Sequence, residues 1–201
     1  MTRLARLPQD RLGALIGPGG DVKATIERRA KVRLRIDSET GDVEIVEGEK
    51  TDPLRALQAE EVVKAIGRGF APENAYALFR EEMYLAIIDL RDYAGHKESR
   101  QRQIRGRVIG EKGRTRRMIE ELTGCKVAIQ GNTVALIGEV DGLEAAKRGV
   151  DMLLSGSEHS TVYGFLERQH KAMRLAMLDA VENVAGSGPD PRDRLPAADE
   201  E

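Results

Sequence analysis

Aromatic residues make up only 3% of this 201-residue sequence, and it contains a single cysteine, Cys125. Scarce aromatics disfavour RRM and OB folds, in which bases stack on aromatic side chains. A lone cysteine cannot form an internal disulfide and gives no sign of an oxidising compartment. The sequence lacks an apolar run near the roughly 18 residues that span a bilayer. Its first residues, from Met1 to Arg6, lack the apolar core of a signal peptide. We therefore expect a cytoplasmic protein without a membrane partner.

The sequence also lacks a recognisable catalytic or metal-binding constellation. His96, His159 and His170 show no metal-ligand spacing with Cys125. Neither a Walker A sequence nor a three-glycine dinucleotide fingerprint is present. We interpret Cys125 as a small apolar side chain at the end of a helix rather than as a nucleophile. The expectation is a protein that is not an enzyme and that needs no cofactor or metal ion.

Charge is unevenly distributed along the chain, although the net charge is only −2. Residues 91–117 contain ten basic and three acidic side chains, a net charge of +7. Residues 179–201 contain two basic and seven acidic side chains, a net charge of −5. The distribution of charge indicates a partner better than its sum does. A basic middle segment and an acidic C-terminal tail are therefore expected.

An internal repeat organises the sequence. Residues 16–27 align without gaps on residues 109–120, and each copy continues into two short segments of period-two alternation. Each copy ends in an Ala-rich amphipathic stretch, residues 53–66 and 140–154. The pattern predicts a strand, a helix, a glycine loop, a second helix, a two-stranded hairpin and a final helix in each copy. This order makes the chain an α+β protein.

The repeat and the segments around it predict the domain boundaries. Residues 74–82 have a helical pattern, and so have residues 161–178, where Val162 and Leu166 lie one turn apart. Pro and Gly residues from Gly186 onward favour disorder. The predicted parts are a first domain over 1–70, a helical linker over 71–82, a second domain over 83–157, a helical extension over 158–182 and an acidic disordered tail over 183–201.

Each glycine loop, Gly17–Gly20 and Gly110–Gly113, is expected to join two helices. Two glycines separated by two residues leave backbone N–H groups open at the start of the second helix. Those donors and the helix dipole favour phosphate oxygens. The apolar residue just before each loop, Ile16 or Ile109, can floor a groove in which unstacked bases lie. The loops are therefore candidate sites for a nucleic-acid backbone.

Residues 13–20 and 106–113 resemble the signature of the KH family, an aliphatic pair followed by GXXG. The resemblance implies two tandem type I (eukaryotic-type) KH domains, each with βααββα order, a three-stranded antiparallel sheet and three helices. It also implies that each loop clamps about four nucleotides of a single strand. A single GXXG also fits an ordinary turn between helices. Two copies at one offset argue against coincidence.

The second loop is predicted to be the stronger RNA site, because a lysine lies inside it and arginines follow in the next turn. Arginine pairs well with phosphate and stacks on bases. A charge run of this kind also fits a solvated helix face, and for Arg100 and Arg102 both interpretations stay open. The predicted RNA-binding residues are Arg107, Ile109, Gly110, Glu111, Lys112, Gly113, Arg114, Arg116 and Arg117.

The first loop departs from the KH pattern, since Pro18 and Gly19 supply no base and Asp21 follows at the helix start. Asp21 stabilises the helix but repels phosphate. Degenerate KH copies often serve as structural or protein-docking units. The predicted weaker RNA-binding residues are Ile16, Gly17, Pro18, Gly19, Gly20 and Lys23.

Within the KH family, residues 105–124, 133–138 and 160–167 are similar to archaeal small-ribosomal-subunit assembly factors. This resemblance implies single-stranded RNA at the 3′ end of small-subunit rRNA as the target. The candidate protein partners are the endonuclease that trims this rRNA end and a translation initiation factor. Tyr163 and Phe165 fit packing between helices better than base stacking. Two alternatives stay open, a general mRNA-binding translational regulator and a protein-interaction scaffold with degenerate KH domains.

Overall fold

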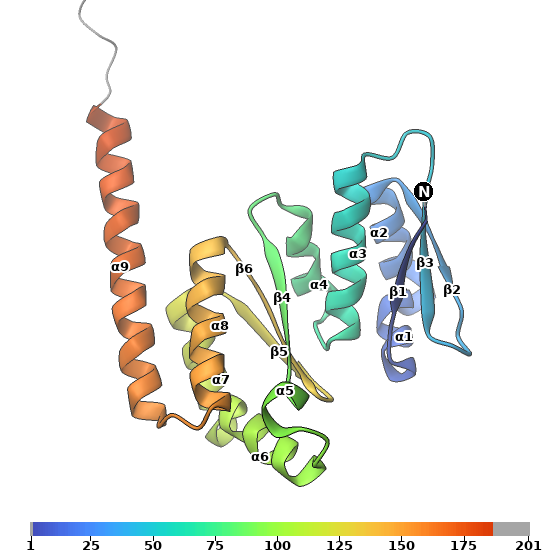
Figure 1. Cartoon of the computed structure of the whole chain (residues 1–201). Helices are drawn as coiled ribbons and strands as arrows, with labels where there is room; N and C mark the ends of the chain where they lie inside the picture. The colour runs from blue at the N-terminus through green and yellow to red at the C-terminus, as the bar shows by residue number, and fades with distance from the viewer. Residues whose placement is uncertain (1, 187–201) are drawn as a thin grey trace, which may run out of the picture.

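The computed structural model describes residues 2–186, and Figure 1 shows two small α/β units followed by a long helix. Most of the expected acidic tail, residues 187–201, lies outside the described residues. No helix within residues 2–186 is long and apolar enough to cross a membrane.

The first unit follows the predicted order of elements. Its strands form an antiparallel sheet in the order β1-β3-β2. Along β2, Val32 and Leu34 are buried, whereas Arg33 and Arg35 are exposed, so one face of the sheet packs on helices and the other meets solvent. The elements are β1 (Thr2–Arg6), α1 (Gln9–Ile16), the 3₁₀ turn η1 (Pro18–Gly20), α2 (Asp21–Ala30), β2 (Val32–Ile36), β3 (Asp42–Glu47) and α3 (Pro53–Gly67).

The second unit repeats this order, with one additional short helix after its first strand, and forms an antiparallel sheet β4-β6-β5. The expected α+β class is confirmed, with three antiparallel strands in each of the two sheets. The elements are β4 (Tyr84–Asp89), α5 (Arg91–Ala94), α6 (Glu98–Ile109), the 3₁₀ turn η3 (Glu111–Gly113), α7 (Arg114–Thr123), β5 (Lys126–Gln130), β6 (Thr133–Gly138) and α8 (Val140–Leu154).

The structure contains a one-turn helix, α5, that the sequence did not predict. It begins where the carboxylate of Asp89 accepts a hydrogen bond from the Arg91 N–H at 2.8 Å. Such side-chain acceptors satisfy the open N–H groups at a helix start. The helix ends at Gly95, which has a φ of 60°.

The linker between the units is less helical than expected. A short helix α4 (Pro72–Ala75) continues into a 3₁₀ turn η2 (Tyr76–Phe79), and the backbone becomes extended at Arg80. The prediction that the helix reaches residue 82 is therefore wrong. Leu78 and Phe79 are buried, and the Phe79 carbonyl accepts a hydrogen bond from Arg55 at 2.8 Å. These contacts fix the end of the turn and leave residues 80–82 exposed.

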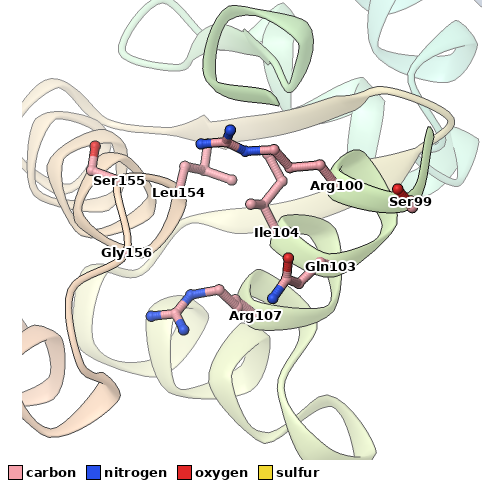
Figure 2. Close-up of a pocket in the computed structure, with 8 residues that line it drawn as sticks. All are labelled: Ser99, Arg100, Gln103, Ile104, Arg107, Leu154, Ser155 and Gly156. Carbon is pink, nitrogen blue, oxygen red and sulfur yellow. The ribbon is translucent and has the colours of Figure 1, made fainter. Parts of the chain in front are cut away.

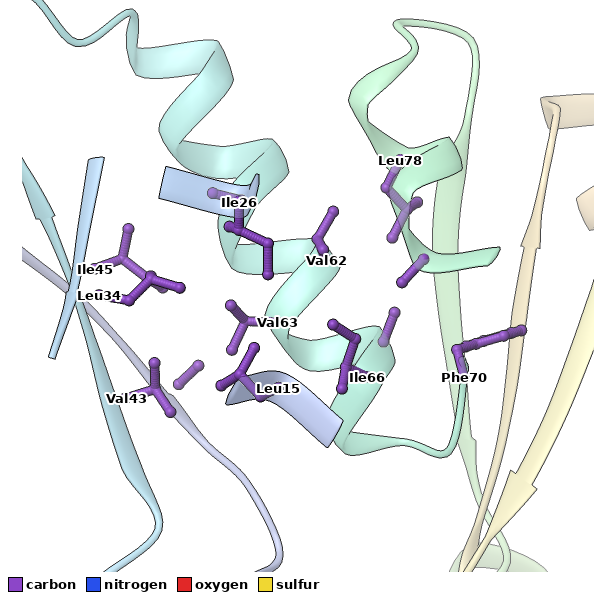
Figure 3. Packing of buried hydrophobic residues seen from close by; sticks show 14 of the residues in the cluster. Leu15, Ile26, Leu34, Val43, Ile45, Val62, Val63, Ile66, Phe70 and Leu78 are labelled. Atoms are coloured by element: carbon purple, nitrogen blue, oxygen red, sulfur yellow. The ribbon is translucent and has the colours of Figure 1, made fainter. Parts of the chain in front are cut away.

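The two units share apolar contacts. Every residue of β6 is buried, because α6, α7 and α8 cover one face of the second sheet and the first unit covers the other. Ala135 and Ile137 belong to the same apolar cluster as Ile66 and Leu78. Figure 3 shows Ile66, Phe70 and Leu78 between the first sheet and the strands of the second unit. The second sheet is therefore an inner layer of the molecule.

A long helix, α9 (His159–Gly186), packs against α7 and α8. Its buried contacts are Val162 and Leu166, both fully inaccessible. The helix ends four residues later than the predicted boundary at 182. No glycine or proline interrupts residues 165–185, so nothing breaks the helix before Gly186. The C-terminal end of α9 extends beyond the second unit in Figure 1.

Candidate nucleic-acid interface

The two glycine loops have nearly the same backbone conformation. Gly17 has φ 73° and ψ 172°, and Gly110 has φ 71° and ψ 173°. The third loop residue is left-handed in both copies, with φ 60° at Gly19 and 49° at Lys112. Lys112 therefore holds a conformation that L residues with a side chain seldom adopt. The sequence repeat is a structural repeat at this site.

The first glycine of each loop is required by a close approach to the following helix. A Cβ atom on Gly110 would lie 2.1 Å from Thr115 Oγ1, and one on Gly17 would lie 2.4 Å from a methyl of Val22. The last glycines, Gly20 and Gly113, have open space around them and a left-handed backbone. Each loop is therefore held tightly at its first glycine and faces open space at its last.

The apolar residue before each loop is partly open to solvent, at 36% for Ile16 and 37% for Ile109. On the same side of α6 as Ile109, the Arg105 guanidinium donates to the Gly131 carbonyl at 2.9 Å. This contact turns that side of α6 toward the β5–β6 hairpin. The described geometry thus brings an apolar surface, the loop and the edge of the second sheet to one side of the unit.

The predicted basic side chains of the second unit lie around its loop. Lys112, Arg114, Arg116 and Arg117 are all exposed. Arg117 Nη2 donates to the Lys112 carbonyl at 3.1 Å, and Arg116 Nε lies 3.9 Å from a carboxylate oxygen of Glu120. These four residues are called the α7 basic cluster below. Glu111 is the acidic residue within the loop and is also exposed.

The first loop offers less positive charge. Pro18 and Gly19 are exposed, Lys23 is half-buried and the Asp21 carboxylate is exposed beside the loop. Pro18 also lacks the N–H that Glu111 carries at the aligned position. The electrostatic difference between the loops predicted from sequence therefore persists in three dimensions.

Arg107 stands apart from the other predicted RNA-binding residues. Its Nε donates to the Leu153 carbonyl at 3.0 Å, and its Nη2 donates to the Ser157 carbonyl. The guanidinium is half-buried between α6 and the turn after α8. Its position is set by main-chain oxygens rather than by the loop.

Side chains of α9 hold the helices on either side of the second loop, and the sequence pointed to Tyr163 as a packing residue but not to His159 or His170. Tyr163 Oη lies 2.8 Å from Thr115 Oγ1 in α7. His159 Nε2 lies 3.0 Å from the Arg107 carbonyl in α6, and His170 Nδ1 lies 2.8 Å from the Leu122 carbonyl in α7. Spacings of four and seven residues place these three side chains near one face of the helix. That spacing was the available signal, and it favours the packing role expected for Tyr163.

A glutamate of the repeat also has a structural role that was missed. Glu27 accepts a hydrogen bond from the Leu34 N–H at 2.8 Å, and Glu120 accepts one from the Val127 N–H at 3.0 Å. Each carboxylate thereby satisfies a backbone donor on the edge strand that follows its helix, β2 after α2 and β5 after α7. The repeated Glu after Ile26 and Ile119 was the sequence signal.

Side chains that could bind a metal ion are not clustered in the described structure. Within residues 2–186, no cluster of three or more His, Cys, Asp or Glu side chains could hold a metal ion. Cys125 is 1% exposed, and burial raises the pKa of its thiol. These observations agree with the interpretation of Cys125 as an apolar core residue.

The βααββα order, the β4-β6-β5 sheet and the GXXG loop together define the second unit as a type I KH domain. A family model described as a eukaryotic-type KH domain (KH domain type I) matches residues 84–171. KH domain-containing protein MJ0443 of Methanocaldococcus jannaschii is 45% identical over 177 residues, which cover 88% of this chain and 77% of that protein. The chain belongs to the family of KH-domain proteins related to Pno1 and archaeal Dim2p.

Solved structures agree with this assignment. Dim2p from Pyrococcus horikoshii is similar with a TM-score of 0.78 and 45% identity, covering 84% of this chain and 99% of that one. A chain of the a/eIF2alpha–aDim2p–rRNA complex from the same organism gives a TM-score of 0.80 and 44% identity, covering 86% and 95%. The pre-rRNA-processing protein pno1 of Aspergillus fumigatus is 29% identical over 177 residues, which cover 86% of this chain and 70% of that protein.

Proposed function

We propose that this chain is a single-stranded RNA-binding protein that acts in assembly of the small ribosomal subunit and has no enzymatic activity of its own. The observation that carries this proposal is the second glycine loop with the α7 basic cluster beside it. Exposed lysine and arginine side chains attract phosphate, and a glycine loop lets the nucleic-acid backbone approach closely. A role with ribosomal RNA is also supported by the relatives named for pre-rRNA processing and by the solved complex that contains rRNA.

Both βααββα units serve as KH domains in this proposal, although the family model matches the second unit alone. The shared element order, the shared sheet order and the matching loop dihedrals support the assignment of the first unit. Its weaker charge makes it the subordinate RNA site. The proposed domain boundaries remain 1–70 and 83–157.

The proposed target is the 3′ region of small-subunit rRNA in the cytoplasm. A translation initiation factor is a proposed protein partner, which is supported by the presence of a/eIF2alpha in the solved complex of a relative. The rRNA 3′-end endonuclease remains a proposed partner on the resemblance alone. Phosphate contacts should make the affinity fall steeply as salt rises.

The test replaces both central residues of one loop at a time. Glu111→Asp with Lys112→Asp places two negative charges in the second loop, and Pro18→Asp with Gly19→Asp does the same in the first. Asp tolerates the left-handed conformation at positions 112 and 19, so the folded state should survive, as thermal melting would show. Binding is measured with an oligonucleotide from the rRNA 3′ end and with a scrambled control at two salt concentrations.

We expect the second-loop variant to lose most RNA binding and the first-loop variant to lose less. Equal losses would contradict the ranking of the two loops. Equal affinity for the scrambled RNA would leave RNA binding intact but remove the proposed target. Absence of salt-dependent binding by the unaltered chain would overturn the proposal and favour the protein-interaction scaffold.

A further inference from the structure

A cavity of about 510 Å³ lies between α6 and the end of α8 (Figure 2). Arg100, Ile104 and Arg107 of α6 line it, together with Leu154, Ser155 and Gly156 at the end of α8. We propose that this cavity is a subsite for one further nucleotide of the RNA strand bound at the second loop, with its phosphate held by Arg100 and Arg107. This inference rests on the proposed function and extends the RNA site beyond the loop.

The charge of the lining favours an anion. Two arginines and no carboxylate line the cavity. A neighbouring cavity between β4 and α8 is also partly basic, but Asp89, Asp92 and Asp151 line it. A third, along α9, contains several glutamates in its wall. Of these three cavities in the described part of the chain, the one beside α6 has positive charge without an opposing acid.

Donors remain available on both arginines. A guanidinium has five N–H groups, and Arg107 uses two of them on the Leu153 and Ser157 carbonyls. These bonds hold the Arg107 fork in place, so little side-chain entropy is lost when it binds a phosphate. Arg100 is exposed, and no ion pair within residues 2–186 includes it. It is free to move toward a ligand.

The rest of the lining suits the uncharged parts of a nucleotide. Ile104 is 7% exposed and Leu154 is 5% exposed, so their accessible atoms form an apolar floor. Figure 2 shows the guanidinium groups of Arg100 and Arg107 on opposite sides of Ile104. The Gln103 amide at the rim can donate and accept hydrogen bonds. An apolar floor with a cation on each side fits a base or ribose, and the exposed Arg100 side chain can swing toward a phosphate that the fixed Arg107 guanidinium holds.

The cavity lies within reach of an RNA strand that leaves the second glycine loop. Arg107 precedes Gly110 by three residues and Arg100 precedes it by ten, which corresponds to about 5 Å and 15 Å along the helix. Ile109 and Arg105 lie on another side of α6, facing the hairpin. An RNA strand that passes over the C-terminal end of α6 would therefore connect the second loop with the cavity.

The first unit lacks the helical turn that builds this cavity. Helix α1 has eight residues and begins after Pro8, whereas α6 has twelve. The position aligned with Arg100 is Leu7, which precedes α1 and is 3% exposed. The proposed subsite is therefore a property of the second unit and adds to the difference between the two RNA sites.

The experiment measures RNA affinity of the full chain against oligonucleotide length, from four nucleotides to about eight, for Arg100→Gln and Arg102→Gln. Arg102 is an exposed arginine of the same helix that does not line the cavity, so its variant matches the change in charge. We expect Arg100→Gln to leave the four-nucleotide affinity unchanged. With the longer RNA it should lose about fivefold in affinity, and its log–log salt slope should fall by about 0.7. Arg102→Gln should keep the affinity and the salt slope of the unaltered chain at every RNA length.

Other outcomes overturn the inference in distinguishable ways. Unchanged affinity of Arg100→Gln for every length, while the second-loop variant loses binding, would remove the subsite and leave the proposed function intact. Equal losses from Arg100→Gln and Arg102→Gln would show a general charge effect rather than a subsite. If the second-loop variant also binds RNA normally, the second loop is not the RNA site and the subsite beside it fails with it, whereas absence of RNA binding by the unaltered chain would remove the proposed function itself.

Discussion

Arg11 and Arg107 make the same contacts in the two units from positions that do not align in the sequence repeat. Arg11 donates from Nε to the Ile66 carbonyl at 2.9 Å and from Nη2 to the Phe70 carbonyl at 2.8 Å. Arg107 donates to Leu153 and Ser157, the corresponding carbonyls at the end of α8. In the repeat alignment Arg11 pairs with Ile104, one turn before Arg107. Both units need donors for the open carbonyls at the end of α3 or α8, and each unit supplies them from a different position of the repeat.

Replacing Arg107 with Lys should reduce stability more than RNA affinity for a short oligonucleotide. A lysine keeps the charge but cannot bridge two carbonyls as a planar guanidinium does. Hydrogen bonds with a charged donor contribute about 1.5–3 kcal/mol each, so we expect a loss of about 2 kcal/mol in the free energy of unfolding. Urea denaturation measures it, with Arg11→Lys as the matched variant. Unchanged stability with weakened binding would assign Arg107 to the RNA instead.

Removing the Glu120 carboxylate should loosen the edge strand β5. Glu120→Ala leaves the Val127 N–H without its acceptor, and we expect a loss of about 1–2 kcal/mol. Hydrogen exchange of the Val127 amide should accelerate. Glu120→Gln retains an acceptor oxygen and should stay close to the unaltered protein. Glu121→Ala, at the exposed neighbouring position, is the control, and an equal loss there would contradict the assigned contact.

Two glycines four residues apart should respond to alanine in opposite directions. Gly110 has φ 71° and ψ 173°, a region open essentially to glycine alone, and its Cβ would clash with Thr115. Gly110→Ala should therefore destabilise the fold by about 2 kcal/mol or more. Gly106 lies inside α6 with no atom near its Cβ position, so Gly106→Ala should stabilise by about 0.5–1 kcal/mol. Thermal melting of both variants decides the matter, and stabilisation by Gly110→Ala would refute the loop geometry.

The Cys125 thiol should react slowly with a disulfide reagent at pH 8 in the folded protein and rapidly in urea. Burial raises its pKa, partly offset by the hydrogen bond to Thr123, so little thiolate is present. A raised folded-state pKa means that the folded chain binds this proton more tightly. The resulting stability is fully present below the ordinary thiol pKa, about 8.5, and is lost as pH rises through the higher folded value. Against Cys125→Ala, the stability of the unaltered chain should therefore decline in alkaline buffer.

Much of the fold could be predicted from local sequence. The repeat, the glycine breaks at Gly17 and Gly110 and the alternation in β2 depend on neighbouring residues, and the order of elements in each repeat was found apart from the short helix α5. What was missed depends on distant partners. Arg107 meets carbonyls 46 and 50 residues further along the chain, and His159 meets a carbonyl 52 residues before it. The length of the linker turn is likewise set by burial of Leu78 and Phe79 rather than by their own helical pattern.

The burial of β6 on both faces limits how freely the repeats can be separated. Ala135 and Ile137 contact the first unit, so a fragment beginning at Met83 would expose these side chains to water. Exposed apolar sheet surface promotes self-association. The two repeats are thus not portable modules that can be excised and recombined. Because they share one apolar cluster, we expect them to unfold together, so that damage to the first repeat also weakens the second.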